Sequence, residues 1–161
     1  MTTAFKDFLG QQAEKHRAQV IAGKATVEEW HAAIERLFDQ LRAWLKESDP
    51  EGVIEIEQGH QDVTEPGLGR YRVPRLNLRA FGKWIGIIPK ARRTVGTATP
   101  PQKSAPQRAA GRVDITDELR RYVLYRFQED GGDVWLIDDL ESGAKPLDQE
   151  AFERALMSYL R

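Results

Sequence analysis

The residues that could bind a charged ligand gather in one stretch, residues 67–113, which contains no Asp or Glu. This stretch holds 11 of the chain's 24 Lys and Arg residues, so 13 lie outside it, together with all 25 Asp and Glu residues. Clustered cations attract phosphates and carboxylates, so the stretch is a candidate binding surface. We assign these residues to binding of a partner or a nucleic acid: Arg70, Arg72, Arg75, Asn77, Arg79, Lys83, Lys90, Arg92, Arg93, Lys103 and Arg108.

The spacing of these residues predicts how three of them are presented. Arg75, Asn77 and Arg79 alternate with apolar residues, so they share one face of a predicted strand. Alternate side chains on a strand are about 6.5–7 Å apart, and such a row can follow successive phosphates or an acidic strip on a protein. Bases would also need aromatic side chains to stack on, and only Phe81 and Trp84 are candidates here. Trp84 suits a core position equally well.

A structural role for the same cations is an alternative. In an antiparallel sheet, Arg75 and Arg79 could face Glu55, Glu57 or Asp114 on neighbouring strands. Cross-strand charge pairs of this kind contribute about 0.2–1 kcal/mol each. The formal net charge of the whole chain is only −1, which is consistent with such internal pairing. Under this interpretation the cations stabilise the sheet and bind nothing.

Catalytic motifs are scarce. The chain has no cysteine, which excludes disulfides, thiolate catalysis and Cys-ligated zinc. The chain lacks the Gly-x-Ser-x-Gly motif of serine hydrolases and the phosphate-binding Gly-x-x-x-x-Gly-Lys-Ser/Thr motif. Among the histidines, only His60 could form a proton-transfer pair, with Asp62 as its partner. Helical spacing predicts that His16 and His31 are partly buried structural residues. We assign no catalytic residue, metal ligand or cofactor, although the carboxylates of residues 133–139 could hold Mg²⁺ in a metal-dependent hydrolase.

The N-terminal 48 residues have helical spacing. Phe5, Leu9, Ala13, His16 and Val20 recur at three- and four-residue intervals and predict a helix over about residues 3–22. Gly23 can close a helix, and Thr26 with Glu29 forms a capping box that can open a second one. The second helix has its own apolar stripe, from residue 27 to residue 45. We therefore expect an antiparallel helical hairpin over residues 1–48.

From residue 53 the apolar period changes to two, which predicts an antiparallel sheet of six or seven short strands over residues 53–140. The first strand is expected over residues 53–57, followed by a polar turn region over residues 58–69. Residues 97–110 contain three prolines and many small polar residues, so we expect a mobile loop there. Asp148 is a good N-cap, and a final helix over residues 147–161 is expected to pack on the sheet.

These elements predict one α+β domain over residues 1–161. The N-terminal residues lack the pattern of a signal peptide and no apolar run could span a bilayer, so we expect a cytoplasmic protein without membrane contacts.

The first functional hypothesis is a non-enzymatic accessory domain that docks on a protein with an acidic surface. A nucleic-acid-binding module, using the basic sheet face and residues 97–110, is the alternative, and the hydrolase is a second one. The pattern specifies neither the partner nor the oligomeric state.

Overall fold

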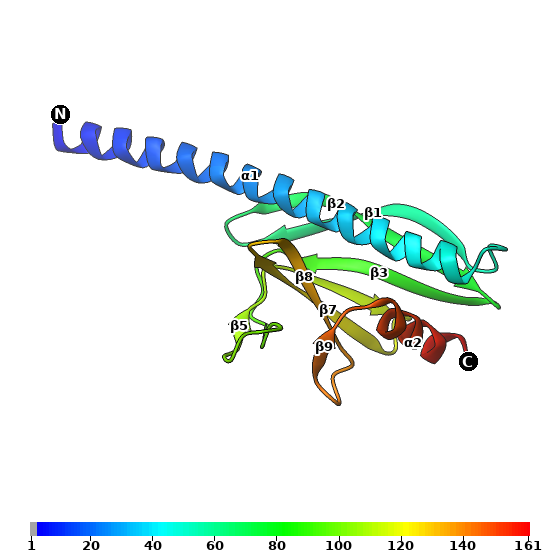
Figure 1. The fold of residues 1–161 in the computed structure, drawn as a ribbon. Helices are drawn as coiled ribbons and strands as arrows, with labels where there is room; N and C mark the ends of the chain where they lie inside the picture. The colour runs from blue at the N-terminus through cyan, green and yellow to red at the C-terminus, as the bar shows by residue number, and fades with distance from the viewer. Residues whose placement is uncertain (1–2) are drawn as a thin grey trace.

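The computed structural model describes residues 3–161 and confirms the α+β class (Figure 1). A long helix, α1 (Thr3–Ser48), precedes a seven-stranded antiparallel sheet, and α2 (Gln149–Leu160) follows it. The sheet order is β1-β2-β3-β6-β7-β8-β9. Its strands are β1 (Glu55–Glu65), β2 (Gly69–Ala80), β3 (Lys83–Ala91), β6 (Arg112–Thr116), β7 (Arg121–Glu129), β8 (Gly132–Asp138) and β9 (Ala144–Pro146).

The expected helical hairpin is wrong, because α1 runs without a break from Thr3 to Ser48. Gly23 does not take a left-handed conformation, and Thr26 does not cap a new helix: its hydroxyl donates to the Ala22 carbonyl, 2.9 Å away, as in a helix interior. Gly23 instead lies against the turn between β1 and β2. A Cβ at this position would be 3.3 Å from the Gly67 carbonyl oxygen, so the glycine permits close approach of the turn.

Only the C-terminal half of α1 packs on the sheet. Trp30, Ile34 and Leu41 are fully buried there, in one core with Leu76 of β2 and Phe152 of α2. Both helices therefore contribute to the core on the same face of the sheet (Figure 1). As predicted, Asp148 caps α2, since its carboxylate accepts a hydrogen bond of 2.8 Å from the Ala151 amide.

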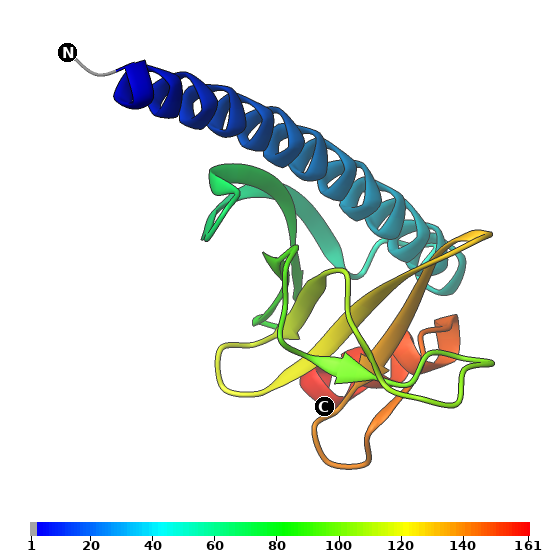
Figure 2. The ribbon, with the colours of Figure 1, turned by 90° about the vertical axis from the view of Figure 1, so that its left-hand side faces the viewer.

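The N-terminal half of α1 projects beyond the sheet (Figure 2). Every residue from 3 to 22 is exposed, including His16, for which we predicted partial burial. The helical stripe that was predicted for this half is present, but no other element of the described chain covers it. His31, in the packed half, is partly buried as expected.

The first strand is longer than predicted, because β1 continues to Glu65 and leaves only residues 66–68 as a turn. The β1–β2 register is continuous from Glu55 opposite Arg79 to Glu65 opposite Gly69. The prediction ended this strand where the apolar alternation ends. Backbone hydrogen bonds hold the β1–β2 ladder regardless of the side chains, so a polar edge strand can continue beyond that point.

Residues 97–110 are not a simple loop. They contain a two-stranded ladder of β4 (Thr97–Ala98) and β5 (Gln107–Arg108), which pairs Thr97 with Arg108. The segment is anchored on β7, where the Ala110 amide donates to the Arg126 carbonyl at 2.6 Å. Ala109 is buried there with residues of β7 and β8 in a small second core. The mobility of this segment remains a prediction.

Neither α1 nor α2 combines the length and apolar character that a transmembrane helix requires.

Candidate binding surface on the open sheet face

The face of the sheet that points away from both helices presents the predicted row of polar residues. On β2, Leu76 and Leu78 are buried towards the helices, and Arg75, Asn77 and Arg79 lie on the other side. The strand register extends this face across four strands, because Asn77 is opposite Gly86, Gly86 is opposite Thr116, and Thr116 is opposite Arg121. The prediction that Arg75, Asn77 and Arg79 share one face is therefore confirmed.

A hollow of about 430 Å³ lies on this open face. Four cations and two carboxylates contribute to its lining. The cations come from β2, β3, β7 and the turn directly before β7. Arg75 and Lys90 belong to the predicted binding residues, whereas Arg120 and Arg121 do not. The complete lining is Arg75, Trp84, Ile88, Lys90, Asp114, Thr116, Glu118, Leu119, Arg120 and Arg121.

Trp84 organises one side of the hollow. Its indole lies over Gly86, where a Cβ would be only 2.7 Å from the ring, so the ring occupies the space of the missing side chain. Its Nε1 donates to the Asn77 side-chain oxygen at 3.1 Å. The Arg75 guanidinium lies 5.7 Å from the indole centroid and donates to Asn77 and Gln61, each at 3.0 Å. Trp84 is therefore part of the open face and not of the core.

The buried carboxylate of the hollow already has a cation. Asp114 accepts two hydrogen bonds from Arg112, at 2.8 and 3.0 Å, and these bonds raise the pKa of Arg112. Asp114 therefore does not neutralise Arg75 or Arg79, as the structural alternative supposed. Arg79 lies opposite Glu55 in the strand register, and Asn77 lies opposite Glu57.

Within residues 3–161, the side chains of Lys90 and Arg121 form no hydrogen bond or ion pair, and both are exposed. Arg120 is turned towards α2, where it donates to the Ser158 carbonyl at 2.9 Å and lies 5.1 Å from the ring centroid of Tyr159. An incoming anion would therefore meet Lys90 and Arg121 first, with Arg75 held beside them on the indole.

Two predicted residues, Arg70 and Arg72, lie on the β1–β2 hairpin away from the hollow. Both donate to Asp62 on the paired strand, at 2.8 and 3.3 Å. The hydrogen bond from Arg70, followed by that from Arg72, lowers the pKa of Asp62. Arg70 and Arg72 therefore pair with an acid of the neighbouring strand, Asp62, as the structural alternative supposes for cations of the basic stretch.

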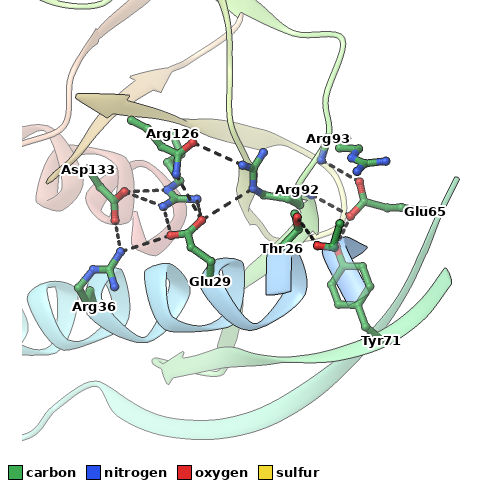
Figure 3. A network of polar contacts seen from close by, with 11 residues as sticks. Thr26, Glu29, Arg36, Glu65, Tyr71, Arg92, Arg93, Arg126 and Asp133 are labelled. Carbon is green, nitrogen blue, oxygen red and sulfur yellow. Dashed lines mark hydrogen bonds and ion pairs between the residues drawn. The ribbon is translucent and has the colours of Figure 1, made fainter. Parts of the chain in front are cut away.

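Arg92 and Arg93 lie on the helix side of the sheet (Figure 3). Their backbone amides donate to the buried Glu65 carboxylate, each at 2.9 Å, and the Tyr71 hydroxyl also donates to it. Burial and the adjacent Glu65 raise the pKa of Tyr71. The Arg92 guanidinium is largely buried, and this burial lowers its pKa. The backbone of these two residues therefore anchors Glu65, and neither residue lines the hollow.

The remaining predicted residues are dispersed. Lys83 donates to the backbone carbonyl of Arg161, and Lys103 lies 3.9 Å from Glu129. Arg108 is exposed on β5. The eleven predicted residues thus do not lie on a single surface, and the hollow combines only Arg75 and Lys90, beside Asn77.

The carboxylates considered for a metal site have other partners. Asp133 lies 2.8 Å from Arg126 and 2.7 Å from Arg36, in a network that also includes Glu29 (Figure 3). Asp139 accepts from the Ser142 hydroxyl and from two turn amides, which lowers the pKa of Asp139 to about 2. Within residues 3–161, no group of three or more His, Cys, Asp or Glu side chains is placed to hold a metal ion.

Sequence reasoning missed two kinds of residue. Arg121 follows an acidic turn and lies outside the acid-free stretch, yet its position opposite Thr116 places it on the open face. The sequence did not indicate this, because residues 122–125 are apolar on both faces of the strand. Arg126 binds Glu29, which is 97 residues distant in the chain, and no local pattern could have paired them.

Comparison of the chain with protein-family models, with curated proteins and with solved structures gave no match.

Proposed function

We propose that the protein is a non-enzymatic binding domain, an accessory unit that docks an acidic segment of a protein partner on the open sheet face. The observation that carries this proposal is the excess of cations in the hollow: Lys90 and Arg121 are exposed, while its buried acid, Asp114, is already paired with Arg112. A carboxylate from outside would supply the missing negative charge. Guanidinium and ammonium groups bind carboxylates through short, charge-assisted hydrogen bonds.

The nucleic-acid alternative depends on the same cations. Nucleic-acid phosphates could follow them, but stacking of bases needs accessible aromatic faces. Trp84 is the aromatic residue of the hollow, and Arg75 already lies against its ring. This arrangement favours a carboxylate ligand over a nucleobase. The hydrolase alternative has less support, because Asp133 is engaged by two arginines.

A direct test uses an acidic decapeptide that alternates Glu and Val, with a Lys-Val peptide as its charge control. The Lys90→Glu/Arg121→Glu variant should bind the acidic peptide at least about tenfold more weakly than the unmodified chain, because it places like charges together. Lys46→Glu/Lys145→Glu is the matched control, since both lysines are exposed elsewhere and the change in net charge is the same. Fluorescence anisotropy measures each affinity.

Equal losses in the two variants, or no binding of the acidic peptide by the unmodified chain, would contradict the proposal. A labelled single-stranded oligonucleotide tests the alternative in the same assay. Tight binding of the oligonucleotide that weakens steeply with salt, and that depends on Lys90 and Arg121, would favour the nucleic-acid function instead.

A further inference from the structure

The apolar stripe of α1 continues past the edge of the sheet. Val27, Trp30 and Ile34 recur at three- and four-residue intervals in the packed half, and Gly23, Val20 and His16 extend the same intervals towards the N-terminus. Residues so spaced lie on one face of a helix, so the buried stripe emerges in phase onto the projecting half. Phe5, Phe8, Leu9 and Val20 are 50–60% exposed there. We call the face formed by these four residues the projecting stripe.

A groove of about 520 Å³ lies at the base of the projecting stripe, between α1 and the β1–β2 turn. Val20, Gly23 and Val27 line it from the helix, and Leu68 and Tyr71 line it from the hairpin. Leu68 and Val27 also contact the main core, so the apolar surface is continuous from the core to the projecting stripe. His16, Lys24 and Arg70 surround this apolar floor.

The charged residues of the projecting half are segregated around the projecting stripe. Arg17 and Lys24 are seven residues apart and lie along one of its edges, next to Val20, while Lys6 is on the same edge next to Leu9. Lys15 is seven residues from Phe8 and lies along the opposite edge. Both edges of the projecting stripe are therefore basic.

The acidic residues of this segment avoid both edges. Asp7 and Glu14 are seven residues apart, so they form a row of their own, and helical geometry places that row on the back of the helix. Glu14 is three residues before Arg17, but the ion pairs between residues three or four apart within residues 3–161 are Asp39–Arg42 and Glu150–Arg154, so neither Glu14 nor Asp7 forms an ion pair with the cations at the edges.

We propose that the projecting stripe and its groove bind an amphipathic helix of a partner protein, one that carries Asp or Glu on both sides of its apolar residues. Such a helix would cover the exposed apolar side chains and pair its carboxylates with Lys6, Arg17 and Lys24 on one edge and with Lys15 on the other. A second copy of this chain fits less well, since its own basic edges would meet the same cations. Residues 3–22 extend over about 30 Å, enough for nearly three heptads of a helix pair.

This surface shares no residue with the hollow on the open sheet face. The inference therefore stands or fails independently of the proposed function.

The test uses the full chain and a synthetic helix of three heptads, with Leu at positions a and d and Glu at positions e and g. A peptide with Lys at e and g is the charge control. We expect the Glu peptide to bind at least about tenfold more tightly than the Lys peptide, because opposite charges at the edges select the partner. Lys6→Glu/Arg17→Glu/Lys24→Glu should reverse this preference.

Two single substitutions locate the site. Val20→Glu should weaken binding of the Glu peptide by about tenfold or more, because it places a carboxylate at the centre of the apolar contact. Ile21→Glu is the matched control: Ile21 is 70% exposed, lies off the projecting stripe, and receives the same charge. Ile21 and Val20 both lie about one helical turn from Arg17 and Lys24, so either new carboxylate can pair with these cations, but only the one at Val20 enters the apolar contact. The loss of affinity for Ile21→Glu should therefore be clearly smaller than the loss for Val20→Glu. Both sites are exposed, and circular dichroism checks that both variants fold.

Three results would overturn the inference: equal binding of the Glu and Lys peptides, equal losses in the Val20 and Ile21 variants, or no binding of the Glu peptide. Sedimentation of the chain alone provides a fourth. A dimer that Val20→Glu dissociates would show that a second copy covers the projecting stripe.

Discussion

The two halves of helix α1 have the same spacing of apolar residues but different surroundings. In the packed half, Trp30, Ile34 and Leu41 are completely buried. In the projecting half, Phe5, Leu9 and Val20 stay at least half exposed. Periodicity therefore identifies the face of a helix that is suited to burial, but it does not identify what buries that face, or whether this chain does so.

Polar contacts separate the two halves as clearly as apolar ones do. Glu29, in the packed half, binds Arg126 of β7, and Arg126 also binds Asp133 of β8 (Figure 3). Trp30 stacks on Trp135 with 6.2 Å between ring centroids. The projecting half has no such contact to the sheet among the hydrogen bonds and ion pairs of the described chain.

The largest expected effect tests the polar contacts of the packed half. Arg126 is 1% exposed, and its hydrogen bonds to Glu29 and Asp133 outweigh the effect of burial, so the pKa of Arg126 is raised. Arg126→Ala would leave two carboxylates close together and should lower the free energy of unfolding by about 3–5 kcal/mol. Urea unfolding measures it.

Arg36→Ala is the control for this substitution. Arg36 joins the same network, but more than half of its side chain is exposed, so the loss should be about 1 kcal/mol or less. A loss from Arg126→Ala as small as that expected for Arg36→Ala would show that the network is no more than a surface feature.

A smaller effect tests the apolar contacts. Leu41→Ala should cost about 2–5 kcal/mol, because it leaves a cavity between α1 and the sheet. Leu9→Ala makes the same chemical change in the projecting half, where Leu9 is half exposed, and should change the global stability by less than about 0.5 kcal/mol. Comparable losses in denaturant would show that the projecting half is covered in the free protein.

The smallest effect concerns the glycines of α1. A Cβ at Gly10 would meet nothing within 4 Å, so Gly10→Ala should gain about 0.5–1 kcal/mol of local helix stability. Slower amide hydrogen exchange around residue 10, with unchanged global unfolding, is the expected readout. Gly23→Ala should gain less, since its Cβ would press on the Gly67 carbonyl. A larger gain at Gly23 would show that the β1–β2 turn yields easily.

The sequence was enough to predict whether most segments form a helix or a strand, because apolar periods of 3.6 and 2 are properties of the local chain. It failed at Gly23, where the same residue can end a helix or permit close packing within one. The capping pattern of Thr26 and Glu29 was equally ambiguous, since Glu29 accepts a hydrogen bond from the distant Arg126 and caps no helix. Only the tertiary contacts distinguish these alternatives.

The candidate site was predictable only within single strands. Alternation placed Arg75, Asn77 and Arg79 on one face correctly, but it could not add Arg121, because residues 122–125 are apolar on both faces of β7. It could not place Arg92, because the register between β3 and β6 shifts between Pro89 and Ala91 and the chain then leaves the sheet. A basic stretch that is continuous in sequence was thus divided between the two faces of the sheet.

The unbroken course of α1 has a mechanical consequence. An arm of about 30 Å is fixed at one end, so each degree of tilt at its base displaces its tip by about 0.5 Å. A load applied near Phe5 would be transmitted as a torque to the stacked rings of Trp30 and Trp135. A joint at Gly23 would have absorbed that torque, whereas the continuous helix delivers it to the sheet.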